Sequence, residues 1–296
     1  MRIAVAGPIE IPFPVKDYGG IELIAQDLTE ALISMGHTVD LYGRGQAKKY
    51  PISDEYDAYF DFTHLTVKEI ANRKGYFRTV FLTDVPDQRF NIYPSYAVKE
   101  RIGISGTVIY PGIKNVYREG EDHGYLLFLG RIHPIKGVHV AISVARIAGI
   151  RLVIAGHTGS FANPMYVEMI RSAVRNDQLI QMVENPSRNR KVELLSHAHA
   201  VILPSDWSWL GYAESFGLTA VEALMSGKPV ITSGDGGLSE IVTPQVGFVC
   251  RTLDEYLQAV KSIDTIDKKE IRKRAEYFTV QRMARDYIDL VEKSLK

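Results

Sequence analysis

The sequence has very little cysteine and no net charge, and each absence excludes a class of protein. Cys250 is the only cysteine among the 296 residues, so the chain can form no internal disulfide and offers no cysteine-based zinc site. Lysine plus arginine number 35, as do aspartate plus glutamate, which gives a formal net charge of zero. Because no overall positive field would attract nucleic acid, we predict no nucleic-acid partner.

Long apolar runs are missing as well. No run approaches the ~20 residues that a membrane-spanning helix needs. Pro8, Glu10 and Pro12 interrupt the first apolar stretch too early for the core of a signal peptide, and we therefore expect a cytoplasmic protein. One basic stretch, residues 268–274, contains an interleaved glutamate. Such a stretch is typical of a solvated helix face, with peripheral membrane contact as the alternative.

What the sequence does contain is an alternation of short apolar runs with amphipathic helical patterns, which predicts parallel sheets covered by helices. The glycines after the first run, which ends at Gly7, do not have the spacing of a dinucleotide fingerprint, so a Rossmann dehydrogenase is disfavoured. Residues 115–124 are polar and show no pattern, which is typical of a linker. We therefore expect an N-terminal domain over residues 1–117, a second domain over 118–278 and a terminal helix over 279–296.

The most informative stretch is residues 201–231, where an expected strand leads through a polar loop into an expected helix. Glu214 lies at the mouth of the loop, and Glu222 lies eight positions later, inside the helix. Unpaired N–H groups at a helix N-terminus suit an anionic ligand, and carboxylates accept hydrogen bonds from hydroxyls. This combination indicates a site for a sugar nucleotide, which carries both diols and phosphates. The residues expected at the helix start are Ser215, Phe216, Gly217 and Leu218.

Charged and flexible residues also follow other expected strands. Arg131 and Lys136 flank a turn after Gly130, and two cations so placed can neutralise a diphosphate. The segment is not a Walker loop, because its glycine spacing differs and no serine or threonine follows Lys136. Further candidate ligand residues at helix starts, in glycine loops or at strand ends are Gly19, Gly20, His64, Asp84, His157 and Gly237.

Together these strings resemble family 4 of the retaining glycosyltransferases of GT-B fold. The similarity lies in Glu214 and Glu222 with seven residues between them, in the Gly-Arg-x-x-x-x-Lys-Gly string at 130–137, and in the Gly-Gly loop at 19–20. It implies an α/β protein of two Rossmann-like domains, with parallel sheets facing a central cleft and a C-terminal helix that crosses back to the first domain. Three features depart from the family pattern: Ser215 replaces a frequent proline, Asp84 replaces the usual histidine, and the usual glycine is absent near residues 184–187.

The resemblance also implies roles. The first domain would bind the acceptor and the second the donor, a UDP- or GDP-sugar. Arg131 and Lys136 would hold the diphosphate, Glu214 the hexose and Glu222 the ribose, with Asp84 as a further candidate catalytic residue. The implied reaction moves a hexose to a hydroxyl of a saccharide, lipid or small molecule. Anomeric configuration would be retained, and neither a metal nor another cofactor would be needed.

Three alternatives stay open at this point. The first domain is short for this family, which would suit a nucleotide-sugar-binding protein without transferase activity. Another GT-B enzyme, such as a sugar-nucleotide epimerase or a phosphorylase, would carry similar motifs. A membrane-associated partner module would use the basic helices near the C-terminus. The sequence predicts neither the oligomeric state nor the linkage formed.

Overall fold

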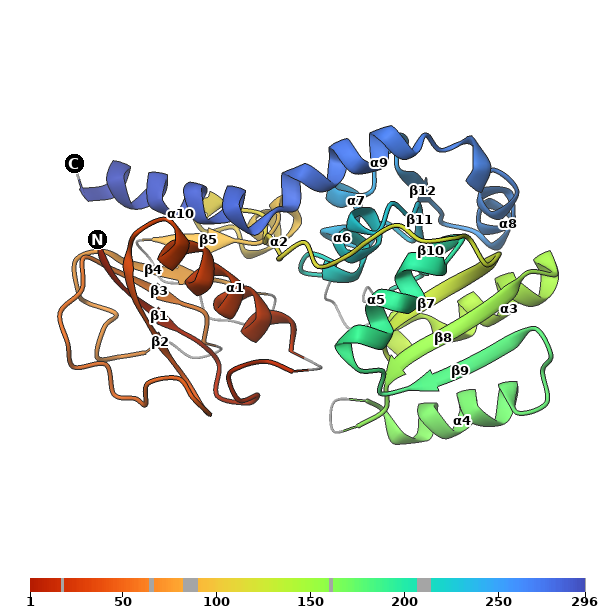
Figure 1. Cartoon of the computed structure of the whole chain (residues 1–296), viewed down its shortest axis with the longest axis horizontal. Helices are drawn as coiled ribbons and strands as arrows, with labels where there is room; N and C mark the ends of the chain where they lie inside the picture. The colour runs from red at the N-terminus through yellow and green to blue at the C-terminus, as the bar shows by residue number, and fades with distance from the viewer. Residues whose placement is uncertain (17–18, 64–66, 82–89, 160–161, 207–213, 296) are drawn as a thin grey trace. The chain divides into compact units, whose positions relative to one another are not determined.

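The chain folds into two compact units, Met1–Lys114 with Tyr277–Lys296, and Asn115–Glu276 (Figure 1). The structure is a computed structural model that describes residues 1–16, 19–63, 67–81, 90–159, 162–206 and 214–295. Each unit contains a six-stranded sheet, and every strand pairing in both sheets is parallel. The predicted α/β class with two parallel-sheet domains is therefore confirmed.

The sheet of the first unit has the order β2-β1-β3-β4-β5-β6. Its strands are β1 (Arg2–Ala6), β2 (Thr38–Tyr42), β3 (Ala58–Asp61), β4 (Tyr76–Thr79), β5 (Asn91–Tyr93) and β6 (Thr107–Val108). Ile3 of β1 pairs with Val39 on one side and with Ala58 on the other. The central strands β3 and β4 are buried along their whole length, as expected for a parallel sheet that is covered on both faces.

In the described residues of the first unit, the α-helices are α1 (Gly20–Ser34), α2 (Tyr96–Ile102) and α10 (Val280–Leu295). The terminal helix α10 packs beside α1, as Figure 1 shows. Its residue Tyr287 is buried and lies edge-on to Phe60 of β3, with ring centroids 4.9 Å apart. The Tyr287 hydroxyl also lies 2.9 Å from Thr79 Oγ1 on β4. The last helix of the chain is thus built into the core of the first unit.

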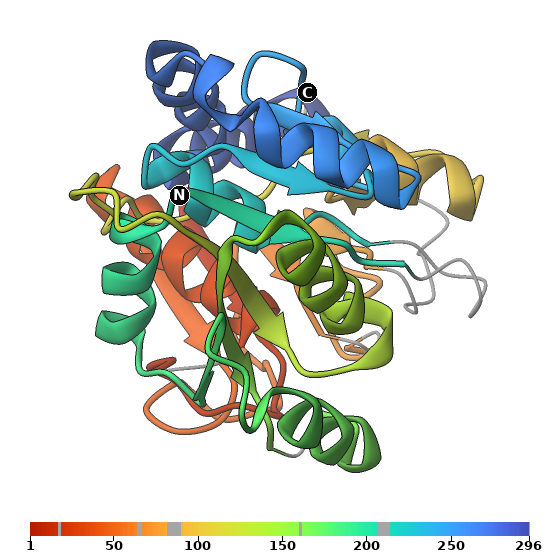
Figure 2. The same ribbon diagram turned by 90° about the vertical axis from the view of Figure 1, so that its right-hand side faces the viewer.

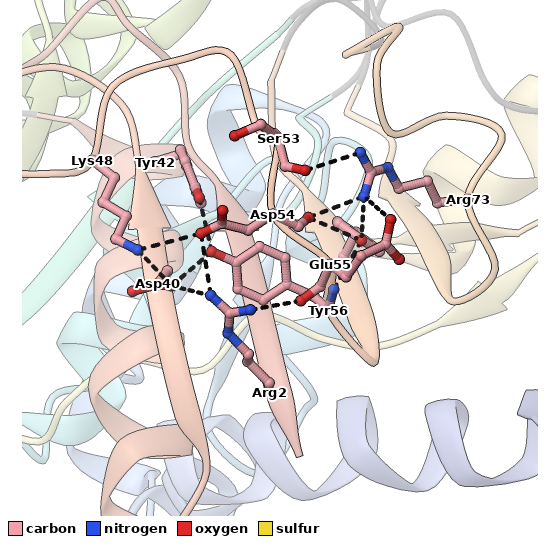
Figure 3. A network of polar contacts seen from close by, with 10 residues as sticks. Arg2, Asp40, Tyr42, Lys48, Ser53, Asp54, Glu55, Tyr56 and Arg73 are labelled. Carbon is pink, nitrogen blue, oxygen red and sulfur yellow. Dashed lines mark hydrogen bonds and ion pairs between the residues drawn. The ribbon is translucent and has the colours of Figure 1, made fainter.

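A polar network fastens the segment between β2 and β3 to the sheet of the first unit (Figure 3). Arg2 donates to Asp54 Oδ2 at 3.1 Å, and the Tyr56 hydroxyl donates to Asp40 Oδ2 at 2.6 Å. Arg73 donates to the carbonyl oxygen of Asp54 at 3.0 Å. Arg2 and Asp54 are about half exposed, so their contact contributes little by itself. The network as a whole orders this segment.

The second unit has the strand order β12-β11-β10-β7-β8-β9. Its strands are β7 (Tyr125–Arg131), β8 (Arg151–His157), β9 (Ile180–Glu184), β10 (Ala200–Leu203), β11 (Val230–Thr232) and β12 (Gly247–Val249). From β7 the chain moves outward to β8 and β9, then returns to place β10 on the other side of β7. The strand order therefore reverses between β7 and β10, and ligands of open α/β sheets bind beyond the carboxyl ends of strands at such a reversal.

Helices cover both faces of the second sheet. They are α3 (Val138–Ala148), α4 (Pro164–Val174), α5 (Arg188–His197), α6 (Leu218–Met225), α7 (Leu238–Ile241), α8 (Leu253–Lys261) and α9 (Lys268–Ala275), with short 3-10 turns η1 (Pro134–Lys136) and η3 (Ile263–Thr265). The turn η4 (Glu276–Phe278) lies where the chain passes from the second unit to the first. Residues of α3, α4 and α8 share one hydrophobic core with the strands. Right-handed crossovers put α3 and α4 on one face and the returning α5 on the other, as Figures 1 and 2 show.

The expected linker residues and the basic stretch are ordered against each other in the second unit. Glu119 accepts hydrogen bonds from Lys268 at 2.6 Å and from Arg272 at 2.5 Å. Arg274 donates to the carbonyl oxygen of Ile241 at 3.1 Å, at the end of α7. Three cations of the basic stretch are thus engaged within the protein. In the described part of the chain, no helix combines the length and the apolar character needed to cross a bilayer.

Candidate functional site

Most of the predicted site residues lie where the strand order of the second sheet reverses. Arg131 is the last residue of β7, Lys136 ends the turn η1 just after it, and Glu214 precedes α6, which follows β10 in the chain. Glu222 lies within α6. The fold therefore brings the two predicted cations and the two predicted carboxylates to neighbouring elements of one sheet edge.

Arg131 has an unusual environment. Its Nε is buried and has no hydrogen-bond partner among the residues that the structure describes. Its neighbour across the sheet is His157, at the end of β8. Burial and then the charge of Arg131 lower the pKa of His157, and the pKa of His133 is lowered by burial and then by Arg131 and Lys136. Because a buried donor without an acceptor is costly, this guanidinium suits an anionic ligand.

The turn that carries Lys136 is fixed by the residues around it. The His133 ring accepts a hydrogen bond from the backbone N–H of Ile135 at 3.4 Å. Gly137 has φ 69°, and a Cβ there would lie 2.0 Å from the carbonyl oxygen of Pro204. Only glycine allows this left-handed backbone and this close approach. The turn is thus pressed against the end of β10, from which the chain continues toward Glu214.

Lys136 and Glu214 form an ion pair between the Nζ atom and Oε2. Their side chains are only 19% and 15% exposed, so water screens the pair far less than a surface pair. The backbone of Glu214 is held in turn: its N–H donates to Asp235 Oδ2 at 3.1 Å, and its carbonyl oxygen accepts from the Gly237 N–H at 2.8 Å. Both the backbone and the carboxylate of Glu214 are therefore held in place by neighbouring residues.

Two glycines allow the loops before α6 and before α7 to interlock. A Cβ at Gly237 would lie 2.6 Å from Phe216 Cα. Gly217, the residue before α6, has φ 111°, and a Cβ there would lie 2.5 Å from Leu238 Cδ2. The predicted residue Ser215 lies in the same loop, and its carbonyl oxygen would lie 2.9 Å from a Cβ added at Gly237. Together these contacts fix the start of α6, where Leu218 is the first helical residue.

Glu222 is buried within α6, with 5% of its surface exposed. The Tyr117 hydroxyl donates to Glu222 Oε1 at 2.6 Å, and Lys191 Nζ of α5 lies 3.2 Å from the same oxygen. Both contacts are made to Oε1, so neither of these donors occupies Oε2. A carboxylate held in this way can accept a hydrogen bond from a ligand hydroxyl through its second oxygen.

The remaining predicted residues are placed as follows. A Cβ at Gly130 would lie 3.7 Å from Phe128, an ordinary contact, so the protein's own packing does not require this glycine. Gly19 has φ 141° and precedes Gly20, the first residue of α1 in the first unit. His64 and Asp84 lie outside the described residues.

Tyr117, Lys191 and His133 were missed in the sequence. Tyr117 lies in the patternless linker, where nothing marks it as a partner of Glu222. Lys191 belongs to α5, a mostly polar helix whose clearest signal is its N-cap Ser187, which accepts a hydrogen bond from the Arg190 N–H at 3.3 Å. Within the described ranges, no three His, Cys, Asp or Glu side chains are grouped so that they could hold a metal ion.

A parallel α/β unit with paired cations and carboxylates at its strand reversal is typical of enzymes that bind phosphorylated ligands. The particular family follows from comparison with known sequences. The family "Glycosyl transferases group 1" matches residues 111–281, more than half of the chain. The chain belongs to this family, and the predicted glycosyltransferase resemblance is confirmed.

Curated relatives match a little under half of the chain. The D-inositol 3-phosphate glycosyltransferase of Mycolicibacterium smegmatis is 31% identical over 151 residues, which are 49% of this chain and 33% of that protein. The protein of the same description from Mycobacterium avium is 29% identical over 147 residues, 44% of this chain and 33% of that protein. The matched part thus spans about a third of the length of these relatives.

Solved structures match the whole chain. AviGT4, a glycosyltransferase involved in avilamycin A biosynthesis, has a TM-score of 0.78 and 23% identity, with 99% of this chain and 98% of that chain covered. Anabaena HepE in complex with UDP and glucose has a TM-score of 0.76 and 17% identity, with 99% and 100% covered. These similarities confirm the predicted GT-B fold class.

Proposed function

We propose that the protein transfers a hexose from a nucleotide-diphosphate sugar, a UDP- or GDP-sugar, to an acceptor hydroxyl. The transfer retains the anomeric configuration and needs no metal. The observation that carries the proposal is the arrangement at the strand reversal, where the buried Nε of Arg131 has no partner among the described residues and Lys136 pairs with Glu214. The second unit binds the donor and the first unit binds the acceptor.

Charge development explains how these residues act. When the bond between the anomeric carbon and the diphosphate oxygen breaks, negative charge grows on the diphosphate. Arg131 and Lys136 stabilise that charge with preorganised donors, and the N-terminus of α6 adds its dipole. These groups take the place of a divalent cation. Glu214 then accepts hydrogen bonds from the hexose, and Glu222 accepts them from the ribose.

The acceptor oxygen forms the new bond to the anomeric carbon on the face from which the diphosphate leaves. The acceptor proton passes to the departing diphosphate oxygen, so no protein nucleophile is required. The relatives are named for D-inositol 3-phosphate, and HepE was solved with UDP and glucose. These compounds are therefore the first acceptor and the first donor components to test.

The direct test measures release of free nucleoside diphosphate from UDP-, GDP- and ADP-sugars, with and without D-inositol 3-phosphate, simple sugars or lipid acceptors. Arg131→Ala and Lys136→Ala should each raise the barrier by about 2–4 kcal/mol, as loss of one oxyanion donor does. The control variants are Arg175→Ala and Lys261→Ala, which remove exposed cations and should keep wild-type rates. Wild-type turnover by Arg131→Ala or Lys136→Ala would reject the diphosphate role.

The same assay separates the alternative functions. A nucleotide-sugar-binding protein would bind donors without acceptor-dependent release of nucleotide. An epimerase would change the sugar while it stays attached to the nucleotide, and a phosphorylase would depend on inorganic phosphate. A membrane-associated module would sediment with anionic liposomes and release nothing.

A further inference from the structure

The Lys136–Glu214 ion pair joins two residues to which the proposed function gives different parts of the donor. Lys136 is assigned to the diphosphate and Glu214 to the hexose. In the structure the two side chains contact each other. Within the described ranges, Lys136 provides the only hydrogen bond or ion pair to the Glu214 carboxylate. Any anionic ligand that pairs with Lys136 must therefore weaken or remove the ion pair of the Glu214 carboxylate.

The cost of that change depends on burial. With 15% of its side chain exposed, Glu214 has little access to water that would replace a lost partner. Removing one member of a mostly buried pair leaves an uncompensated charge, which is far more costly than at the surface. The backbone contacts of Glu214 to Asp235 and Gly237 keep the residue from simply moving away.

We propose that this ion pair makes the site discriminate between intact nucleotide sugar and free nucleoside diphosphate, with Glu214 as the specificity-determining residue. The inference rests on the proposed function. A nucleotide sugar draws Lys136 to its diphosphate and supplies hexose hydroxyls that donate to Glu214. A free diphosphate draws Lys136 equally but leaves the carboxylate without a donor and beside a second anion. The site therefore favours the substrate and expels the nucleotide product.

The test is calorimetric binding of two matched pairs, UDP with UDP-glucose and GDP with GDP-mannose. Glu214→Gln should bind the free diphosphate more tightly than wild type, by about fivefold, the upper end of the range for exposed pairs, because the Glu214 carboxylate no longer competes for Lys136 and the pair is mostly buried. The same variant should bind the nucleotide sugar more weakly. The control Glu100→Gln makes the same change in net charge at an exposed position of α2, in the first unit, and should alter neither affinity.

A second variant distinguishes release of Lys136 from a general charge effect. In a Lys136→Gln background, adding Glu214→Gln should tighten diphosphate binding by less than twofold, since the Lys136–Glu214 pair is already absent. Thermal unfolding of each variant establishes that it is folded. If wild type binds nucleotide sugars but Glu214→Gln binds the free diphosphate no more tightly, this inference is wrong and the proposed function stands. If wild type binds none of the four compounds, both are wrong.

Discussion

Glu222 shows what residue types can and cannot predict. The family resemblance implies that it contacts the ribose, but the orientation of its carboxylate depends on Tyr117 and Lys191, which contact Oε1. Tyr117 is distant in sequence and carries no motif, so only the folded chain reveals the contact. The sequence therefore indicates the charged residues of the candidate site but not Tyr117 and Lys191, which contact one of them.

Removing the Tyr117 hydroxyl tests this positioning role. Tyr117→Phe deletes one hydrogen bond to a buried carboxylate, a contact of about 1.5–3 kcal/mol, and should weaken binding of UDP or GDP by roughly tenfold or more. We expect KM for the donor to rise more than kcat falls, because the hexose and diphosphate contacts persist. The measurement is calorimetry together with steady-state kinetics. An unchanged nucleotide affinity would mean that Glu222 needs no help from Tyr117.

At the scale of elements, a buried ion pair joins β3 to β4 in the first unit. Asp61 and Arg78 are both fully buried, with Arg78 Nη1 3.1 Å from Asp61 Oδ2. The Tyr76 hydroxyl donates to the same carboxylate at 2.7 Å, and the backbone N–H of Thr63 donates to its other oxygen at 2.9 Å. Asp61 thus links two strands to the chain that leaves β3.

Asp61→Ala should lower the free energy of unfolding by about 3–5 kcal/mol, because it leaves the Arg78 charge buried without this partner. Replacing both residues with apolar ones, as in Asp61→Leu with Arg78→Met, should restore much of that loss. Denaturant unfolding followed by circular dichroism measures both. Asp289→Ala removes an exposed carboxylate of α10 in the same unit and serves as the control. Equal stability of Asp61→Ala and wild type would contradict the stabilising role given to Asp61.

Elements with a strong apolar pattern were predictable, and those defined by polar contacts were not. Fully buried strands such as β10 and helices such as α6 follow from apolar runs and their bounding glycines. Helix α5 was not predicted, because its first four residues, Arg188 to Lys191, are all polar. Its place is set by packing on β7, a tertiary contact that the local sequence does not express.

At the scale of the whole molecule, the sequence predicted two parallel-sheet units because strand and helix patterns alternate along the entire chain. The topology adds what patterns alone lack: β10 returns to β7, and this return creates the strand reversal at which Arg131 and the loop before α6 meet. Charged pairs that are far apart in sequence, such as Lys136 with Glu214, follow from that single crossover.

Cys250 offers a reporter for the second unit as a whole. It lies just after β12 and is 2% exposed. Its backbone N–H donates to the Thr232 carbonyl oxygen at 2.7 Å. Burial, with a smaller effect from Glu255, raises the pKa of its thiol to about 11, so the reactive thiolate is scarce at neutral pH. Labelling by a thiol reagent should therefore require opening of this unit.

A nucleotide that binds only the native second unit should slow that labelling. At a free concentration one hundred times its Kd, UDP or GDP would stabilise the native state by about 2.7 kcal/mol, which corresponds to roughly a hundredfold slower reaction if labelling follows opening. The measurement is the rate of thiol modification with and without nucleotide. Arg131→Ala, which weakens binding, should lose the protection at the same nucleotide concentration. A labelling rate that saturating nucleotide leaves unchanged would place nucleotide binding outside the part of the second unit that must open to expose Cys250.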